Sequence, residues 1–185
     1  MELEKLLKSS GDYAAMLPGN YPPSHAYRFG ELIVERIGWH PNLDLHKIIE
    51  SRGGTVHYVD YAVFRRHRDV FLNSIYVRTM DDFDVILPAY ARWSENRFTL
   101  AHELGHYVLH AKKSPQSYAR RNGDTPVERQ ADCFALGFLL PSSHFRLAFE
   151  KYKTVTDLSI AFQVPDFAIR ARAYSLDIRL NDDGN

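Results

Sequence analysis

The sequence predicts an α+β fold that is mainly helical, with a small antiparallel or mixed sheet preceding its histidine-rich helix. Three observations support this class: helical periodicity in the first part, two short alternating segments in the middle, and helical patterns from residue 94 onward. The chain has 185 residues, of which 45% are hydrophobic, so it can bury a core of its own. We therefore expect one domain that spans residues 1–185.

The first part of the chain is expected to hold short helices after an irregular arm. Residues 1–24 form this arm, with a short helix at 1–9 followed by a segment rich in Gly, Pro and Tyr. Residues 26–38 place apolar side chains at helical spacing and end in a glycine. Residues 43–54 predict a second helix, which ends in a glycine pair.

The sheet is expected between these helices and the histidine-rich one. Residues 55–64 look extended, and residues 71–79 and 83–88 alternate in polarity, which predicts a strand pair. We expect strand 83–88 to present an edge to which an extended peptide can add. Helices are then predicted at residues 95–111, 126–140, 143–152, 157–163 and 166–176.

Charge and composition limit the classes of partner. The chain has 23 basic and 23 acidic residues, so strong attraction to nucleic acid or to an anionic membrane is not expected. Its single cysteine, Cys133, cannot form an internal disulfide, which suits a reducing compartment. The first ten residues lack the apolar core of a signal peptide, and no apolar run approaches membrane-spanning length. We expect a cytoplasmic protein without a membrane partner.

The segment RFTLAHELGHYVLH, residues 97–110, carries the clearest chemical signal. His102 and His106 are four residues apart, so on a helix they project from one face and can bind one cation. Glu103 lies about 100° around the helix from His102, where a carboxylate can flank a metal site without ligating the ion. This H-E-x-x-H pattern predicts two metal ligands and a general base.

His110 continues the same register but is not expected to be a ligand. It lies about 12 Å along the helix axis from His102, too far to share one tetrahedral ion. We expect it at the C-terminus of the helix, where a partly cationic imidazole suits the helix dipole. The alternative is a supporting hydrogen bond from His110 to the site.

A third ligand must come from elsewhere, because a catalytic zinc usually has three protein ligands. Glu128 and Asp132 are four residues apart on one face of the helix predicted at 126–140. Glu128 would complete a His/His/Glu set, and Asp132 could hold a ligand histidine by its other ring nitrogen. Residues 125–128, TPVE, also read as a capping box, so capping remains the alternative for Glu128.

Three segments together resemble the ImmA/IrrE family of metallopeptidases. They are RFTLAHELGH, the helix ERQADCFALGFLLP, and LSIAFQVPDFAIRARAYSL near the end of the chain. The resemblance implies a metallopeptidase core at residues 25–152 and a helix-turn-helix-like segment at 153–178. It also implies His102, His106 and Glu128 as ligands of zinc and Glu103 as the catalytic base. Manganese or iron remains an alternative to zinc, because imidazole and carboxylate ligands suit all three metals.

The resemblance further implies a substrate. Members of this family are zinc endopeptidases that cleave a partner repressor of the XRE type, which carries a helix-turn-helix domain.

The mechanism needs an oxyanion donor, for which Tyr107, Tyr118 and His144 are candidates. The polar loop at residues 112–124 lies between the two ligand helices and is expected either to form a mobile rim or to be a solvated connection.

Two other functions compete with proteolysis. The first is a non-proteolytic regulator that binds a repressor or DNA. Arg170 and Arg172 point to nearly opposite sides of one helix, and the net charge is zero, so direct DNA contact is not favoured. The second is a structural zinc site, which is disfavoured because such sites are rich in cysteine and Cys133 points away from Glu128 and Asp132.

Overall fold

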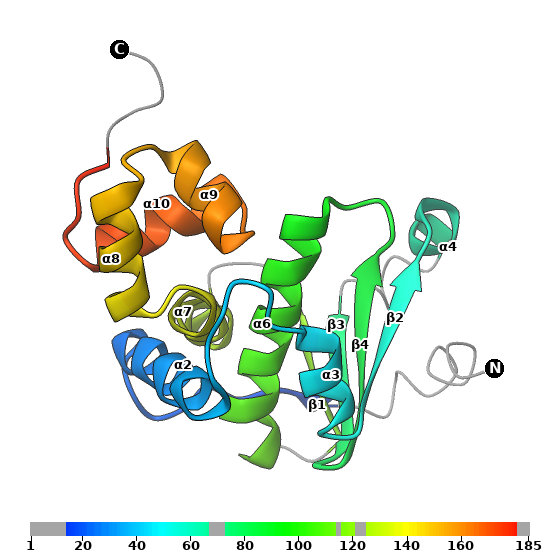
Figure 1. The fold of residues 1–185 in the computed structure, drawn as a ribbon. Helices are drawn as coiled ribbons and strands as arrows, with labels where there is room; N and C mark the ends of the chain where they lie inside the picture. Colours follow the sequence, from blue (N-terminus) through cyan, green and yellow to red (C-terminus); the bar gives the residue numbers. More distant parts are fainter. Residues whose placement is uncertain (1–13, 67–72, 114–115, 121–124, 181–185) are drawn as a thin grey trace.

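The computed structural model describes residues 14–66, 73–113, 116–120 and 125–180. In it a small mixed sheet forms one side of the molecule, and helices α6, α7 and α2 follow as successive layers away from it (Figure 1). Helices α8, α9 and α10 form a cluster beyond α7 (Figure 1). The fold is α+β and mainly helical, which confirms the predicted class.

The sheet has the strand order β1-β5-β3-β4-β2. Strand β3 pairs antiparallel with both β4 and β5, whereas β2 is parallel to β4 and β1 is parallel to β5. The predicted strand pair is therefore present as β3 and β4. The strands comprise β1 (Ala14–Ala15), β2 (Gly54–Val59), β3 (Asn73–Thr79), β4 (Asp82–Pro88) and β5 (Ser117–Arg120).

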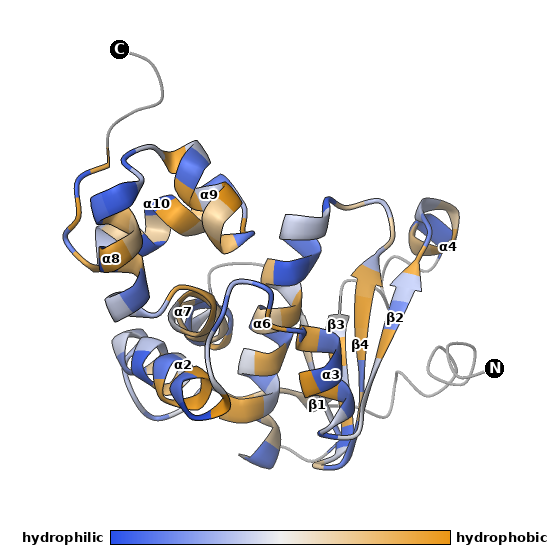
Figure 2. Cartoon of the chain, viewed as in Figure 1, coloured by the Kyte–Doolittle hydropathy of each residue, from blue (hydrophilic) through white to orange (hydrophobic). Residues whose placement is uncertain are grey.

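Strand β4 lies inside the sheet, so the expectation that it presents a free edge is wrong. It is hydrogen-bonded to β3 on one side and to β2 on the other. Phe83, Val85 and Leu87 join the main core, while Ile86 belongs to a second cluster on the opposite face of the sheet. Burial on both faces explains the hydrophobic colour of this strand in Figure 2.

Except for α4, which was not predicted, the described helices lie close to the predicted ranges. They comprise α2 (Pro23–Ile37), α3 (Leu45–Glu50), α4 (Tyr61–Arg66), α6 (Trp93–Leu109), α7 (Pro126–Leu139), α8 (Ser142–Lys151), α9 (Val155–Phe162) and α10 (Asp166–Ser175), with a 3-10 turn at Ala111–Lys113. None of the helices in the described ranges is long and apolar enough to cross a membrane.

Three segments differ from expectation. Residues 55–64 are extended only to Val59, because Asp60 accepts a hydrogen bond from the Val63 amide and starts α4. The expected loop at 112–124 contains β5, whose backbone pairs with β3 and β1. The expected arm at 1–24 contains β1 and the start of α2, and the helix expected at 1–9 lies outside the described residues.

The C-terminal segment forms a helix–turn–helix arrangement that belongs to the main core. Helices α9 and α10 are joined by residues 163–165, and Gln163 adopts the left-handed conformation that ends α9. Leu158, Phe162 and Ile169 are almost fully buried in the same cluster as the apolar residues of α6 and α7. The segment is therefore packed as part of the domain.

A buried ion pair fastens this segment to α2. Arg172 is 2% exposed; its guanidinium contacts the Glu31 carboxylate, and its Nε donates to the carbonyl of Leu140 at 2.8 Å. Glu31 also accepts from the Ser142 amide at 2.9 Å. Arg170 is exposed, which confirms that the two arginines lie on different sides of α10.

We predict that Arg172→Met lowers the free energy of unfolding by about 3–5 kcal/mol, because Glu31 stays buried without its partner. Arg36→Met, which removes an exposed cation from α2, should change it by less than about 1 kcal/mol. Urea denaturation followed by circular dichroism measures both. Replacing both partners, as Glu31→Leu with Arg172→Met, should cost less than the single change. A single-variant loss no larger than that of Arg36→Met would contradict this view of the pair.

Candidate metal centre

Helix α6 carries the histidine pair through the middle of the domain. It lies between the sheet and α7, so His102, Glu103 and His106 are 3%, 0% and 0% exposed. A Cβ atom placed on Gly105 would lie 3.1 Å from the Ala131 carbonyl of α7, which is tighter than usual packing allows. Gly105 therefore lets the two helices approach closely enough for α7 to extend its carboxylates to α6.

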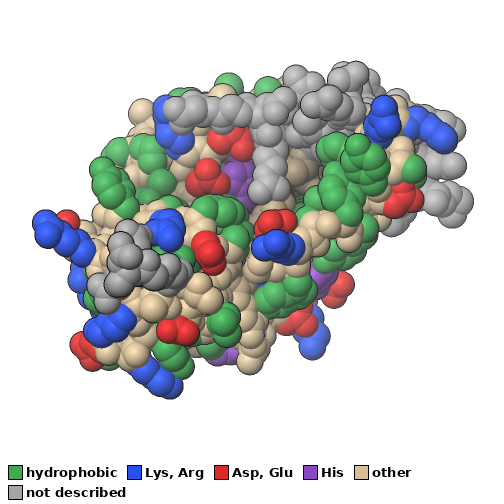
Figure 3. All heavy atoms as spheres, turned by 90° about the horizontal axis from the view of Figure 1, so that it is seen from above, with side chains coloured by type: hydrophobic (Ala, Val, Ile, Leu, Met, Phe, Trp, Pro, Cys, Tyr) green, Lys and Arg blue, Asp and Glu red, His purple; other side chains and the backbone are tan. Residues whose placement is uncertain are grey.

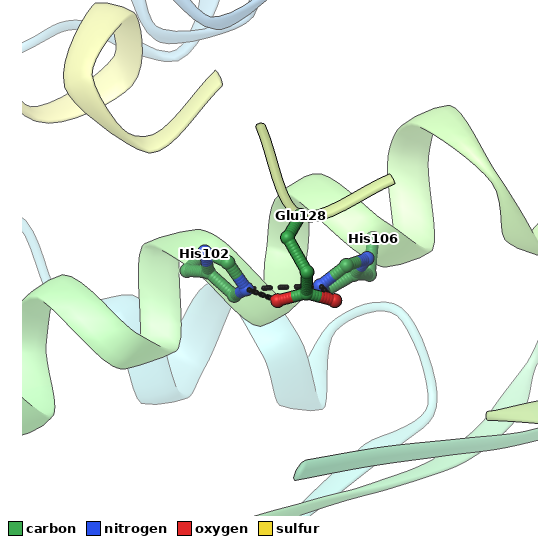
Figure 4. A group of neighbouring side chains, drawn as sticks. All are labelled: His102, His106 and Glu128. Atoms are coloured by element: carbon green, nitrogen blue, oxygen red, sulfur yellow. Dashed lines mark hydrogen bonds and ion pairs between the residues drawn. The ribbon is translucent and has the colours of Figure 1, made fainter. Parts of the chain in front are cut away.

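Three side chains converge between these helices (Figure 4). The Nε2 atoms of His102 and His106 are 2.9 Å apart. The carboxylate oxygens of Glu128 lie 3.2 Å from Nε2 of His102 and 3.3 Å from Nε2 of His106. One ligand atom from each residue thus lies within 4.8 Å of the others, a grouping that could hold a metal ion.

Only half of the capping box expected at residues 125–128 is formed, because the Glu128 carboxylate contacts the histidines and not the Thr125 backbone. The backbone N–H of Glu128 donates to the Thr125 hydroxyl at 3.3 Å, so Thr125 caps α7 as expected. Its carboxylate points toward the two histidines. The capping role therefore needs only the backbone of Glu128 and leaves the carboxylate available to the centre.

Asp132 lies one turn further along α7 and contacts the other side of the His102 ring. Its Oδ1 is 2.7 Å from His102 Nδ1. A carboxylate only accepts hydrogen bonds, so Nδ1 carries a proton and the Nε2 atom faces Glu128 and His106. This is the contact that the spacing of Glu128 and Asp132 predicted.

His110 ends α6 and is completely buried, at 0% exposure. Its Nδ1 lies 3.2 Å from His106 Nδ1, and its Nε2 lies 3.0 Å from the side-chain oxygen of Gln130. Burial, and after it the neighbouring His106, lower the pKa of His110 to about 4. The expectation of a partly cationic imidazole is therefore wrong, while the alternative of a supporting hydrogen bond matches the geometry.

Gln130 is a residue of this site that the sequence did not indicate. It lies on α7 between Glu128 and Asp132 but faces His110 and the backbone of Gly19 and Tyr21. The one available signal is a polar amide within an otherwise increasingly apolar helix. That signal carries no information about its partner, because Gly19 is 111 residues distant in the sequence.

Glu103 is 0% exposed, and in the described part of the chain neither of its carboxylate oxygens has a hydrogen-bond partner. A buried carboxylate without partners is unfavourable unless a proton donor or a cation is nearby. Together with the converging nitrogens of His102 and His106, this orphaned group fits a centre that works with a cation and water.

The electrostatics of the centre also favour positive charge. Burial alone would lower the pKa of His102, but hydrogen bonds to Asp132 and Glu128 outweigh it and raise the pKa to about 10. Burial would raise the pKa of Glu128, but its contacts with His102 and His106 lower it to about 2. Without an ion, a proton on His102 therefore compensates the Glu128 carboxylate, and a bound cation would replace that proton.

A pocket of about 260 Å³ adjoins the centre, since the Glu128 side of α7 forms one of its walls. Strands β1 and β5 form the facing wall. The lining residues are largely apolar or small: Ala15, Met16, Tyr118, Ala119, Thr125 and Val127, together with Glu128.

Two of the three candidate oxyanion donors, Tyr107 and His144, lie away from the candidate metal centre. The Tyr107 hydroxyl donates to the Met80 carbonyl, and its ring stacks on Phe83 on the sheet side of α6. The ring of His144 packs at a tilt against that of Trp39, with ring centroids 4.2 Å apart. Tyr118 borders the pocket beside Glu128, although its ring packs toward Tyr76.

Residues 52–174, about two-thirds of the chain, match the family model Peptidase_M78, described as the IrrE N-terminal-like domain. The match includes α6 and α7, and with them all the residues that converge at the centre. No curated protein matches the chain.

Proposed function

The chain belongs to the IrrE N-terminal-like family of peptidases, and from this premise we propose that it is a zinc-dependent endopeptidase of the H-E-x-x-H type. The observation that carries the proposal is the convergence of His102, His106 and Glu128, which offer one ligand atom each within 4.8 Å. Two imidazoles and one carboxylate are the donor set of many catalytic zinc sites. Manganese or iron suits the same donors.

Glu103 is the proposed general base. A divalent cation at such a centre supplies a Lewis acid and a nucleophilic water at neutral pH. Glu103 follows His102 directly on α6, is buried, and has both carboxylate oxygens free of other hydrogen bonds in the described residues. It can therefore take a proton from the attacking water and later deliver it to the leaving amine.

We propose Asp132 and His110 as the residues that orient the two histidine ligands. Asp132 Oδ1 is 2.7 Å from Nδ1 of His102, the ring nitrogen that faces away from the centre, and Nδ1 of His110 is 3.2 Å from the corresponding Nδ1 of His106. Hydrogen bonds of this kind orient the ring and raise the basicity of the ligand nitrogen.

The proposed substrate is a protein, namely a helix-turn-helix repressor of the XRE type. The support is the family to which the chain belongs. The pocket beside Glu128 is largely apolar, and we propose that a substrate side chain next to the scissile bond enters it. Strands β1 and β5 border this pocket, so they replace strand 83–88 as the place where an extended peptide approaches the sheet.

Direct binding to DNA is not part of the proposal. Arg172, one of the two arginines of α10, is buried against Glu31 and cannot contact bases. On the face seen in Figure 3, Lys and Arg side chains are interspersed with Asp and Glu over its described part, rather than gathered into a basic patch. We propose a cytoplasmic location, where such repressors act.

Glu103→Gln should abolish cleavage of an XRE-type repressor while zinc binding persists, because it removes the base and leaves the ligands. Fragment formation is followed by gel electrophoresis and mass spectrometry, and bound zinc by elemental analysis. Chelation of the metal should also stop cleavage of the repressor by the wild-type chain. Undiminished cleavage by the variant would overturn the mechanism, and an intact repressor with zinc-loaded wild type would favour a binding module.

Glu128→Gln separates ligation from capping with almost no change in shape. The cap at Thr125 uses the backbone N–H of residue 128, which the variant retains. The neutral amide is a far poorer zinc donor than a carboxylate. We expect little change in the thermal stability of the metal-free protein but zinc binding at least tenfold weaker in a chelator competition. Wild-type affinity in the variant would assign the third ligand to another residue.

The pocket predicts a preference for apolar side chains beside the cleaved bond. A peptide mixture in which these positions vary, with products identified by mass spectrometry, should reveal this preference in the wild type. Val127→Gln places a polar group in the pocket and should reduce kcat/KM for the preferred peptides roughly tenfold, the effect of about 1–3 kcal/mol per contact. Leu147→Gln, at an exposed position of α8, is the control. Cleavage without side-chain preference would contradict the subsite.

A further inference from the structure

A chain of hydrogen bonds runs from the segment before α2 to the metal centre. It starts at the backbone of Gly19 and Tyr21, passes through the side chains of Gln130 and His110, and ends on His106. We propose that Gln130 is a positioning residue that selects the tautomer of His106 with a free Nε2 lone pair at the centre. The proposal rests on the proposed function in one respect, namely that His106 is a metal ligand.

The first step fixes the orientation of the Gln130 amide. Its Nε2 donates to the carbonyl oxygens of Gly19 at 2.9 Å and Tyr21 at 2.7 Å. Its Oε1 accepts from the Gly19 backbone N–H at 2.8 Å. Carbonyl oxygens only accept and a backbone N–H only donates, so the three backbone contacts allow one orientation of the amide.

The second step fixes the tautomer of His110. The oxygen of Gln130 lies 3.0 Å from Nε2 of His110. This oxygen can only accept, so Nε2 of His110 must carry the proton. His110 is 0% exposed and has no carboxylate among its hydrogen-bond partners, and a buried cation without such a partner is unfavourable. In the neutral ring, Nδ1 of His110 is therefore an acceptor.

The third step carries the constraint to the centre. His106 Nδ1 lies 3.2 Å from the acceptor Nδ1 of His110, so His106 donates its proton there. The Nε2 atom of His106 is then left with its lone pair, and this atom faces His102 at 2.9 Å and Glu128 at 3.3 Å. The three-step chain thus presents the unprotonated nitrogen that a metal requires.

The two histidines of the centre are oriented by different chemistry, for a physical reason. His102 uses Asp132, whose side chain is 52% exposed and whose charge remains solvated. His106 points into the interior, where Glu103 and Glu128 already place carboxylates. A third buried carboxylate would add desolvation cost and repulsion. The neutral imidazole of His110, held by the amide of Gln130, instead accepts the proton of His106 Nδ1 without adding a charge.

The test is the tautomer of each histidine in the metal-free full chain, measured by nitrogen-15 NMR of the imidazole rings. We expect the wild type to show His106 protonated at Nδ1 and His110 at Nε2. The reverse assignment in the wild type would overturn the proposal without any variant, so the test does not depend on a variant that folds.

Gln130→Leu removes the acceptor, and Gln130→Glu keeps it while losing the two donors. With Gln130→Leu, His106 should become a mixture of tautomers and zinc binding should weaken about tenfold, in the range found for outer partners of metal ligands. With Gln130→Glu, whose carboxylate still accepts from His110, Nε2 of His110 should stay protonated. His102 is the internal reference, because its contact with Asp132 does not involve Gln130. Unchanged tautomers in Gln130→Leu, or loss of the proton from Nε2 of His110 in Gln130→Glu, would contradict the proposed role.

Asn96→Leu is the matched control, because it removes a buried amide from α6 whose donated bond, to the Pro88 carbonyl, has no part in the chain. This variant should leave the tautomers and the zinc affinity unchanged even if it lowers the thermal stability. A shift of the His106 tautomer in this variant would contradict a role specific to Gln130.

The proposed function and the hydrogen-bond chain can fail separately. A wild-type chain that binds no zinc would overturn the proposed peptidase function, whereas the metal-free tautomers test the hydrogen-bond chain by itself.

Discussion

The close contact of α6 with α7 at Gly105 is the constraint on which the site depends. The nearest atom of α7 lies 3.1 Å from the position of a Cβ at this residue, so any larger side chain would press against the α7 backbone. The carboxylate of Glu128 spans the remaining distance to two histidines on α6. The small residue between the histidines is therefore part of the geometry of the centre, although it offers no chemical group. The same principle operates on the other side of α7, where Gly137 lets the backbone of α2 approach.

This contact places several ionisable groups in a core that is otherwise apolar, and all but one of those at the centre have a hydrogen-bond or ion-pair partner. The outer nitrogens of His102 and His106 each have a partner, one at the surface and one in the interior. The carboxylate of Glu103 is the exception among the described residues of the centre, because it has no hydrogen-bond partner. Buried polar groups without partners are uncommon in stable domains and often belong to functional sites. That contrast supports Glu103 as the group that acts on a substrate rather than on the fold.

The C-terminal helices show that a helix–turn–helix arrangement does not by itself indicate contact with DNA. Their apolar residues continue the core of α6 and α7, and the buried pair of Arg172 and Glu31 links α10, α2 and the start of α8. A recognition helix must instead leave its polar side chains accessible on one face. In this domain, α9 and α10 cover the end of the helical layer and so help to hold α7 beside α6.

The sequence by itself determined the features that depend on local periodicity. The spacing of His102 and His106, and that of Glu128 and Asp132, indicated the two helices whose side chains converge at the candidate centre, because residues four apart share a helix face. The helices from residue 94 onward were predicted within a few residues. Only the tertiary structure decided the interior position of strand β4, the strand pairing within the loop at 112–124, and the neutral state of His110. It also revealed the contacts of Gln130, which require Gly19 to lie beside α7. Each of these depends on partners that are distant in the chain, and local patterns carry no information about which distant segments meet.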